Sequence, residues 1–288
     1  MAKRLWVLLP ALALALGAAP QQQGPENYVG WAKNWDEAKT EAQERNVPIL
    51  LTVQQDENQG CQQMEQAFRD TSFILASRKV VCVVSNGDTK HGVREVYINR
   101  VKTPMCKAYD GIMCQVHTDC QRAMDGIFKE GQFDIPCQVW CKPDGTELFK
   151  ITRFQGAPQS AGELIKDMDK ALARISGAHM TRKDWEDVKQ LIKEGQEAEG
   201  KQEWKRALTL YKKLKEVKFE KFAKQGEDLY NGLIQNCVRI CERAKKQYDK
   251  TDKPELKKES KTLLAKISKE MKGTEAGDLA DKFLKELK

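Results

Sequence analysis

The fold is decided by one stretch of the sequence: Val47-Pro-Ile-Leu-Leu-Thr-Val53, a polar segment over residues 54–60, and Cys61-Gln-Gln-Met64-Glu-Gln-Ala-Phe68. The apolar run predicts a strand that is covered on both faces of its sheet. Cys61, Met64 and Phe68 recur at helical spacing and predict one buried stripe of a helix. This order of strand, loop and helix puts Cys61 at a helix N-terminus. Free N–H groups and the helix dipole there favour the nucleophilic thiolate.

The flanking sequence extends this unit into an α/β domain. Val80-Val-Cys-Val-Val84 predicts a second buried strand, which closes a right-handed β-α-β unit with the first. Residues 135–141 and 146–152 predict an antiparallel hairpin, because Lys142-Pro-Asp-Gly145 between them has the residues of a tight turn. Helices are predicted over residues 35–45 and 161–175.

This succession of elements resembles the thioredoxin-like superfamily, and more narrowly it is similar to exported bacterial thioredoxin-like domains. The resemblance implies a three-layer α/β/α domain over about residues 25–177. Within it, residues 88–133 form an insertion longer than the family usually needs. The matching residues are Trp31, Trp35, Ala38, Pro48, Ile49, Leu50, Cys61, Met64, Phe68, Pro136, Asp144, Gly145 and Gly156.

The resemblance also implies roles for single residues. Cys61 matches the family's nucleophilic cysteine, and Pro136 matches its cis-proline, which with Ile135 forms the loop that binds an extended substrate. Met64 stands where the family has its second active-site cysteine, and a thioether cannot resolve a mixed disulfide. Cys137, directly after Pro136, is the candidate resolving thiol from outside the motif.

The first residues have the pattern of a signal peptide, predicted over residues 1–19. Lys3 and Arg4 precede an apolar run over residues 5–16 and the small residues Gly17-Ala-Ala19. The run is short for a membrane span, which needs about 20 residues, although an uncleaved anchor is the alternative. We therefore expect an exported protein, periplasmic or secreted, with no membrane contact beyond the signal peptide. Its nine cysteines invite disulfides outside the cytoplasm.

Residues 180–288 predict a basic, all-α domain of three to five helices. Residues 181–288 hold 28 Lys and Arg against 21 Asp and Glu, which favours a solvated helical surface and no nucleic-acid partner. Breaks are expected at Gly226, at residues 252–254 and at residues 272–273. The spacing of a tetratricopeptide-like helical pair is present in Ala198, Gly200, Trp204, Ala207, Leu208, Tyr211 and Leu214.

Cys61 has two interpretations that the sequence leaves open. It is either a reactive monothiol that attacks disulfides or the relic of a dithiol site, now a partly buried residue at a helix start. Met64 packs in the stripe with Phe68 in the simpler interpretation. The alternative makes Cys61 and Met64 soft copper ligands.

A second group of candidate residues lies in the insertion. Cys106, Cys114, His117 and Cys120 supply four soft or borderline ligands, enough for a closed tetrahedral zinc site. The competing interpretation is a structural disulfide, Cys106–Cys120 or Cys114–Cys120. His91 is interpreted as a single, solvated histidine.

Two functions follow from these features. The first is monothiol-type thiol–disulfide chemistry on an extracytoplasmic protein, with Cys61 as the nucleophile. The second is a non-catalytic module that binds a protein partner, in which the insertion carries a structural disulfide or a zinc or copper ion. The missing second motif cysteine favours the binding function, whereas the nine cysteines favour redox chemistry or a metal site.

Overall fold

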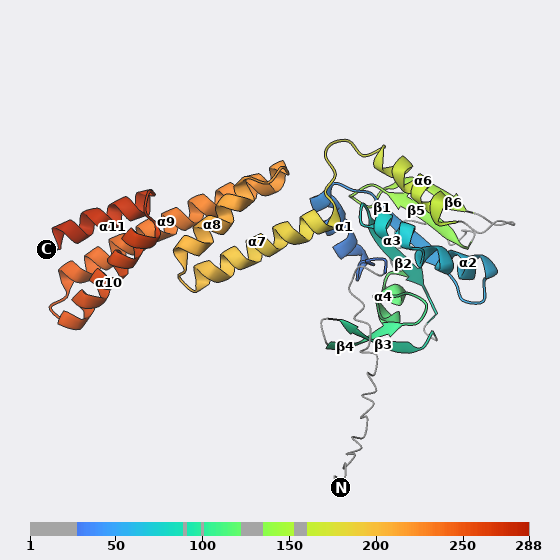
Figure 1. The fold of residues 1–288 in the computed structure, drawn as a ribbon, viewed down its shortest axis with the longest axis horizontal. Coiled ribbons are helices and arrows are strands. Elements are labelled where there is room, and N and C mark those ends of the chain that lie inside the picture. The colour runs from blue at the N-terminus through green and yellow to red at the C-terminus, as the bar shows by residue number, and fades with distance from the viewer. Residues whose placement is uncertain (1–27, 89–90, 99–100, 122–134, 153–159, 288) are drawn as a thin grey trace, which may run out of the picture.

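The computed structural model describes residues 28–88, 91–98, 101–121, 135–152 and 160–287. The predicted signal peptide and Gly156 lie outside these residues. The chain forms a mixed α/β part followed by a helical part (Figure 1). The α/β part contains α1 (Trp35–Arg45), β1 (Ile49–Gln54), α2 (Gln59–Phe68), α3 (Thr71–Ser77), β2 (Val81–Asn86), β3 (Val93–Ile98), β4 (Val101–Cys106), α4 (Cys114–Asp119), β5 (Cys137–Cys141), β6 (Glu147–Thr152) and α6 (Ala161–Leu172).

The central sheet has the strand order β2-β1-β5-β6. Strands β1 and β2 are parallel, with Leu50 opposite Cys82, whereas β5 runs antiparallel to both β1 and β6. The strands predicted from the sequence are therefore confirmed, as is the hairpin. A separate two-stranded sheet, β3-β4, belongs to the predicted insertion.

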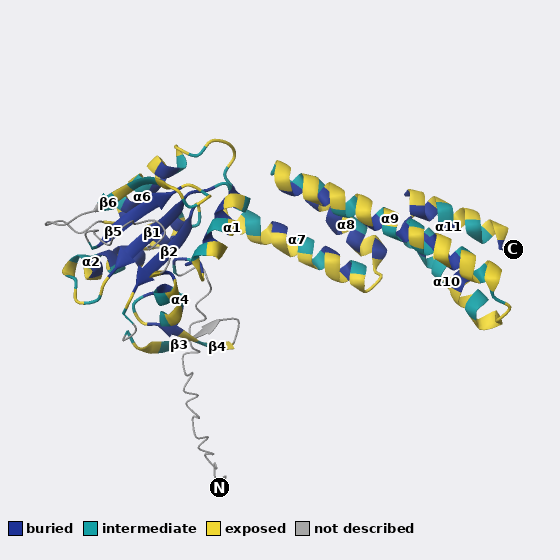
Figure 2. Ribbon diagram, turned by 180° about the vertical axis from the view of Figure 1, so that it is seen from behind, coloured by how far each residue is buried: buried dark blue, intermediate teal, exposed yellow. Residues whose placement is uncertain are grey.

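Helices pack on both faces of the central sheet, so that β1, β2 and β5 are buried throughout (Figure 2). The α2-side core joins the sheet to α2, α3 and α6 through residues such as Leu50, Phe68 and Leu164. The α1-side core joins the opposite face to α1 through residues such as Leu51 and Ala42. The alternation along β1 explains both cores, since successive strand residues point to opposite faces.

The helix starts follow from local sequence. The Asn34 side chain accepts the Glu37 N–H and caps α1, and the Asn58 side chain accepts the N–H groups of Gly60 and Cys61 and caps α2. Ser160 and Glu163 form a reciprocal capping box at the start of α6.

The helical part contains five described helices, in agreement with the prediction. Two of the three expected breaks are confirmed: Pro254 starts α10, and Gly273, with φ +81°, lies between α10 and α11. The third was wrong, because Gly226 lies inside α9. No described helix is long and apolar enough to cross a membrane. The five helices are α7 (Arg182–Gly200), α8 (Trp204–Lys215), α9 (Glu220–Lys250), α10 (Pro254–Glu270) and α11 (Glu275–Glu286).

Glycine at position 226 serves close helix packing. A Cβ atom there would lie 2.6 Å from the backbone nitrogen of Lys215 and 2.7 Å from the carbonyl carbon of Leu214, both at the end of α8. Gly195 of α7 likewise lies against the Tyr211 ring of α8. A glycine in a helical sequence can therefore mark a contact between helices as well as a helix end.

The helical part is joined to the α/β part at α1. The Arg45 Nε donates to the carbonyl oxygen of Met180 at 3.0 Å, and the Met180 N–H donates to the carbonyl oxygen of Arg45 at 2.9 Å. In α7, the Trp185 indole donates to the Glu44 carboxylate at 2.7 Å. These contacts fix the N-terminal end of α7 on α1.

Candidate metal centre

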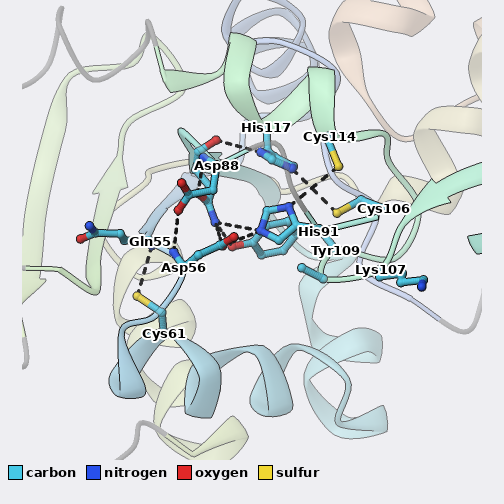
Figure 3. A network of polar contacts seen from close by, with 12 residues as sticks. Gln55, Asp56, Cys61, Asp88, His91, Cys106, Lys107, Tyr109, Cys114 and His117 are labelled. Carbon is cyan, nitrogen blue, oxygen red and sulfur yellow. Dashed lines mark hydrogen bonds and ion pairs between the residues drawn. The ribbon is translucent and has the colours of Figure 1, made fainter. Parts of the chain in front are cut away.

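Four metal-ligating side chains meet beside the end of β2 (Figure 3). They are His91, Cys106, Cys114 and His117, and we call them the Cys/His cluster. Each can offer one ligand atom, and these four atoms all lie within 4.8 Å of one another.

The β3-β4 hairpin and α4 position these side chains. The hairpin pairs Val93 with Cys106, so His91 just before β3 comes beside the end of β4. The Cys106 N–H then donates to the carbonyl oxygen of Ile112 at 2.7 Å, which turns the chain towards α4. Cys114 opens α4, and His117 follows three residues later on the same side of the helix.

His117 is oriented by a backbone carbonyl. Its Nδ1 lies 2.8 Å from the carbonyl oxygen of Asn86, at the end of β2. Because a carbonyl oxygen only accepts hydrogen bonds, Nδ1 carries the proton and the lone pair of Nε2 is free. That Nε2 lies 3.8 Å from the Cys106 sulfur. Burial lowers the pKa of His117, which keeps the ring neutral, as a metal ligand must be.

His91 is oriented by a carboxylate. Its Nε2 lies 2.5 Å from Oδ1 of Asp56, in the loop between β1 and α2, and its Nδ1 lies 3.8 Å from the Cys114 sulfur. The Asp56 oxygen also accepts the Asn86 side-chain amide at 3.0 Å. A histidine that donates one N–H to a carboxylate presents its other nitrogen as a stronger metal ligand.

The thiols differ in exposure and are both free in the structure. Cys106 is buried and Cys114 is half-buried. Burial raises the pKa of the Cys106 thiol to about 11, although hydrogen bonds from the backbone N–H groups of Tyr109 and Ala108 act in the opposite direction. A bound cation would have to displace that proton, so metal affinity would weaken as the pH falls.

The distances fit a tetrahedral ion. Zinc–sulfur bonds of about 2.3 Å and zinc–nitrogen bonds of about 2.0 Å imply sulfur–nitrogen separations of roughly 3.5 Å. The two sulfur–nitrogen distances of 3.8 Å exceed this by a few tenths of an ångström. The widest separation among the four ligand atoms is up to 4.8 Å, so the cluster would contract by about 1 Å to bind one ion.

The sequence-predicted ligand set needs one correction. Cys106, Cys114 and His117 come together as expected, but Cys120 packs in the α1-side core and is not among the four grouped side chains. Cys120 lies six residues after Cys114, which turns it by about 120° around the helix axis and moves it by about 9 Å along it. The predicted Cys106–Cys120 and Cys114–Cys120 disulfides are absent, since all three cysteines are free.

His91, and not Cys120, is the fourth residue of the cluster. The interpretation of His91 as a solvated histidine was therefore wrong. Its side chain is only 7 % exposed. The signal that could have found it is the β-branched and aromatic content of residues 93–98 and 101–106, two segments separated by only two residues, which is typical of a hairpin. A hairpin of that register brings the residues just before and just after it together.

Of the two interpretations that the sequence left open for Cys61, the structure agrees better with the buried residue at a helix start. It is the third residue of α2 and is only 1 % exposed. Burial raises the pKa of its thiol to about 11, and the nearby Glu65 and Asp56 carboxylates add to this effect, whereas the N–H of Gln55 opposes it. The helix N-terminus is thus outweighed by burial, and the group is a thiol at neutral pH.

Met64 is a core residue, as the stripe with Phe68 predicts. Its sulfur accepts hydrogen bonds from the side-chain amide of Gln54 at 3.1 Å and from the Thr52 hydroxyl at 3.5 Å, so polar groups of β1 already occupy it. Among the described residues, no histidine nitrogen or second thiol contacts both Cys61 and Met64, so the copper interpretation gains no support.

The Ile135–Pro136 bond is cis, as the resemblance implies, and this dipeptide lies beside the start of α2. The Asn58 side-chain amide donates to the Ile135 carbonyl oxygen at 3.1 Å, and a Cβ added to Gly60 would lie 2.9 Å from Pro136 Cδ. Cys137, the candidate resolving thiol, packs in the α1-side core. It therefore lies across the sheet from α2 and cannot resolve a disulfide at Cys61.

Comparison with protein-family models and with curated proteins found no match for this chain.

Proposed function

We propose that this chain is an exported zinc-binding protein, in which a closed Cys2His2 centre stabilises the insertion of a thioredoxin-like, non-catalytic protein-binding domain. One observation carries the proposal: four ligand atoms within 4.8 Å, with the second nitrogen of each histidine already hydrogen-bonded. Such outer hydrogen bonds accompany nearly all metal-bound histidines, because they fix the ring and its tautomer.

Zinc fits this ligand set better than copper. Two thiolates and two neutral imidazoles balance the charge of Zn²⁺, whereas Cu⁺ with the same ligands would leave a net negative charge among buried groups. A tetrahedral set of two sulfurs and two nitrogens is also typical of zinc. All four positions are supplied by the protein, which is the pattern of a structural zinc site and not of a catalytic one.

The thioredoxin-like part of the proposal is supported by the connectivity. Parallel β1 and β2 are joined through α2, antiparallel β5 and β6 extend the same sheet, and α6 follows. Cys61 and the Ile135–Pro136 dipeptide lie at the same edge of the α2 layer, which is where the resemblance puts a peptide-binding surface. A groove beside them is lined by Val53, Gln54, Gln55, Ser85, Asn86, Gly87, Asp88, Gln121 and Ile135.

The non-catalytic part rests on Cys61 and its surroundings. A nucleophilic thiol must be accessible and ionised, and Cys61 is buried with a pKa raised to about 11. Met64 supplies no second thiol, and Cys137 lies across the sheet. The monothiol function predicted from the sequence is therefore the less favoured of the two in this conformation.

The metal content of the purified protein tests the proposal. We expect about one zinc per chain, as a four-ligand site requires, with zinc lost in His91→Ala and Cys114→Ser. Cys120→Ser is the matched control, a buried cysteine of the same segment, and should keep its zinc. Wild-type protein that takes up neither zinc nor cobalt would contradict the proposal. A Cys120→Ser variant that loses zinc while His91→Ala keeps it would restore the ligand set predicted from the sequence.

A further inference from the structure

A short loop over residues 55–58 covers Cys61, and we call it the Cys61 loop. It connects β1 to α2. The Gln55 N–H donates to the Cys61 sulfur at 3.3 Å. The thiol is 1 % exposed although it lies in the first turn of a surface helix whose neighbours Gln59 and Gln62 are exposed. The loop is therefore in direct contact with the buried thiol.

The same loop contacts the Cys/His cluster. Asp56, the residue after Gln55, holds the His91 ring through Oδ1 at 2.5 Å (Figure 3). The N–H that contacts Cys61 and the carboxylate that orients a metal ligand thus belong to consecutive residues. The proposed zinc centre and the thiol are joined by a chain of direct contacts.

The loop depends on such contacts, because its backbone is unfavourable by itself. Glu57 has φ +63°, a left-handed conformation that costs a residue other than glycine roughly 1 kcal/mol. The remaining anchors are polar. The Asn86 side-chain amide donates to Asp56 Oδ1 at 3.0 Å, and the Asp56 N–H donates to the Asp88 carboxylate at 2.9 Å. Asn58 bonds the start of α2 and the Ile135 carbonyl oxygen. Polar anchors of a surface loop exchange readily with water. A His91 ring that is fixed in place therefore stabilises the closed position of the loop.

We propose that zinc, by fixing His91, holds Asp56 and so keeps the Cys61 loop closed over the thiol, and that zinc release opens the loop and exposes Cys61. This inference rests on the proposed zinc centre and adds a regulatory role to it. Asp56 is the positioning residue that both sites share. In the open state Cys61 lies uncovered at the N-terminal end of a ten-residue helix, an environment that favours the reactive thiolate.

Alkylation of single cysteines by iodoacetamide tests the proposal on the full-length holoprotein. Three tryptic peptides each hold one cysteine: residues 46–69 report Cys61, residues 80–90 report Cys82, and residues 103–107 report Cys106. Metal analysis of the same sample reports zinc loss, the buried thiol Cys106 reports unfolding of the cluster, and the core thiol Cys82 reports unfolding of the whole domain. Labelling rates are measured by mass spectrometry with zinc bound and after removal of zinc by a chelator.

We expect zinc removal to raise the labelling rate of Cys61 about tenfold or more, which corresponds to roughly 1.4 kcal/mol in the loop-opening equilibrium. Cys82 should stay protected in the same sample. Asp56→Asn should weaken zinc binding about 10- to 100-fold and raise Cys61 labelling even with zinc bound. Glu57→Gln is the matched control, since it removes the neighbouring exposed carboxylate, and should behave as wild type.

Each contrary result has a distinct meaning. If metal analysis shows that bound zinc has been removed while Cys61 stays slow, zinc binds but does not control the loop, and the inference is overturned. If Cys61 and Cys82 react together, the domain unfolds as a whole and the loop has no separate role. If the purified protein holds no zinc and takes up none, the zinc centre itself is wrong and the inference falls with it.

Discussion

Arg45 shows how strongly a single residue can depend on its partners. Its side chain has no exposed surface, and its Nη1 donates to the Glu41 carboxylate at 2.5 Å. Three further N–H groups donate to the carbonyl oxygens of Arg78, Val80 and Met180. Burial lowers the pKa of Arg45, and Glu41 acts in the opposite direction. The guanidinium thus joins α1, the start of β2 and the segment before α7.

Arg45→Met should destabilise the protein by about 3–5 kcal/mol, because it leaves the Glu41 carboxylate buried without its cation. Lys39→Met in the same helix is the control: Lys39 pairs with a largely exposed Asp36, and such surface pairs contribute about 0–1 kcal/mol. Urea unfolding of both variants measures the difference. Equal midpoints for the two variants would contradict this account of Arg45.

At the scale of residues, the sequence predicted that cysteine and histidine ligands come together, but it did not predict correctly which four residues do so. Cys114 and His117 could be paired from spacing alone, since residues three apart share a helix face. Cys120 is also three residues from His117, but it points away from Cys114. Whether Cys114 or Cys120 joins His117 depends on where α4 begins, and it begins at Cys114. His91 is joined to Cys106 through strand pairing, which single-residue spacing does not encode.

At the scale of elements, Gly226 and Gly232 allow a comparison within one helix. Both lie inside α9, yet a Cβ at position 226 meets the backbone of Lys215 at 2.6 Å, whereas a Cβ at position 232 meets nothing within 4 Å. We expect Gly226→Ala to destabilise the helical part by about 1–3 kcal/mol through overpacking. Gly232→Ala should stabilise it by about 0.5–1 kcal/mol through helix propensity. Thermal unfolding followed by circular dichroism measures both, and two shifts of the same sign would contradict the packing of α8 on α9.

The elements of the sheet were predictable because their patterns are local. The apolar runs of β1 and β2 and the Pro-Asp-Gly turn before β6 each lie within a few residues, and all are confirmed. The β3-β4 hairpin was missed because β4 alternates only weakly and contains Pro104. Gly226 was misread because a contact with another helix cannot be seen from one helix alone.

At the scale of the molecule, the buried thiols predict a loss of stability at alkaline pH. Burial is the first cause of each shift, so the unfolded chain, with its ordinary pKa near 9.0, releases these protons first. Stability due to these groups is complete below pH 9 and is lost as the pH rises towards 11–12. The thiols outside the cluster whose pKa is raised to about 11 or 12 are Cys61, Cys82, Cys120, Cys141, Cys237 and Cys241.

Each such thiol should lower the free energy of unfolding by up to about 1.4 kcal/mol per pH unit in that window. Urea unfolding of the zinc-loaded protein under reducing conditions at pH 7.5, 9 and 10.5 measures the slope. The double variant Cys82→Ala/Cys141→Ala is the control, because it removes two of these groups and should show a shallower slope. A free energy of unfolding that stays constant up to pH 10.5 would contradict the burial of these thiols.

The most direct test of the zinc centre is X-ray absorption spectroscopy at the zinc edge of the purified full-length protein. The account predicts two sulfur neighbours at about 2.3 Å and two nitrogen neighbours at about 2.0 Å, from Cys106, Cys114, His91 and His117. Three sulfurs and one nitrogen would show that Cys120 binds in place of His91. Oxygen neighbours alone would show that the cluster does not bind zinc at all.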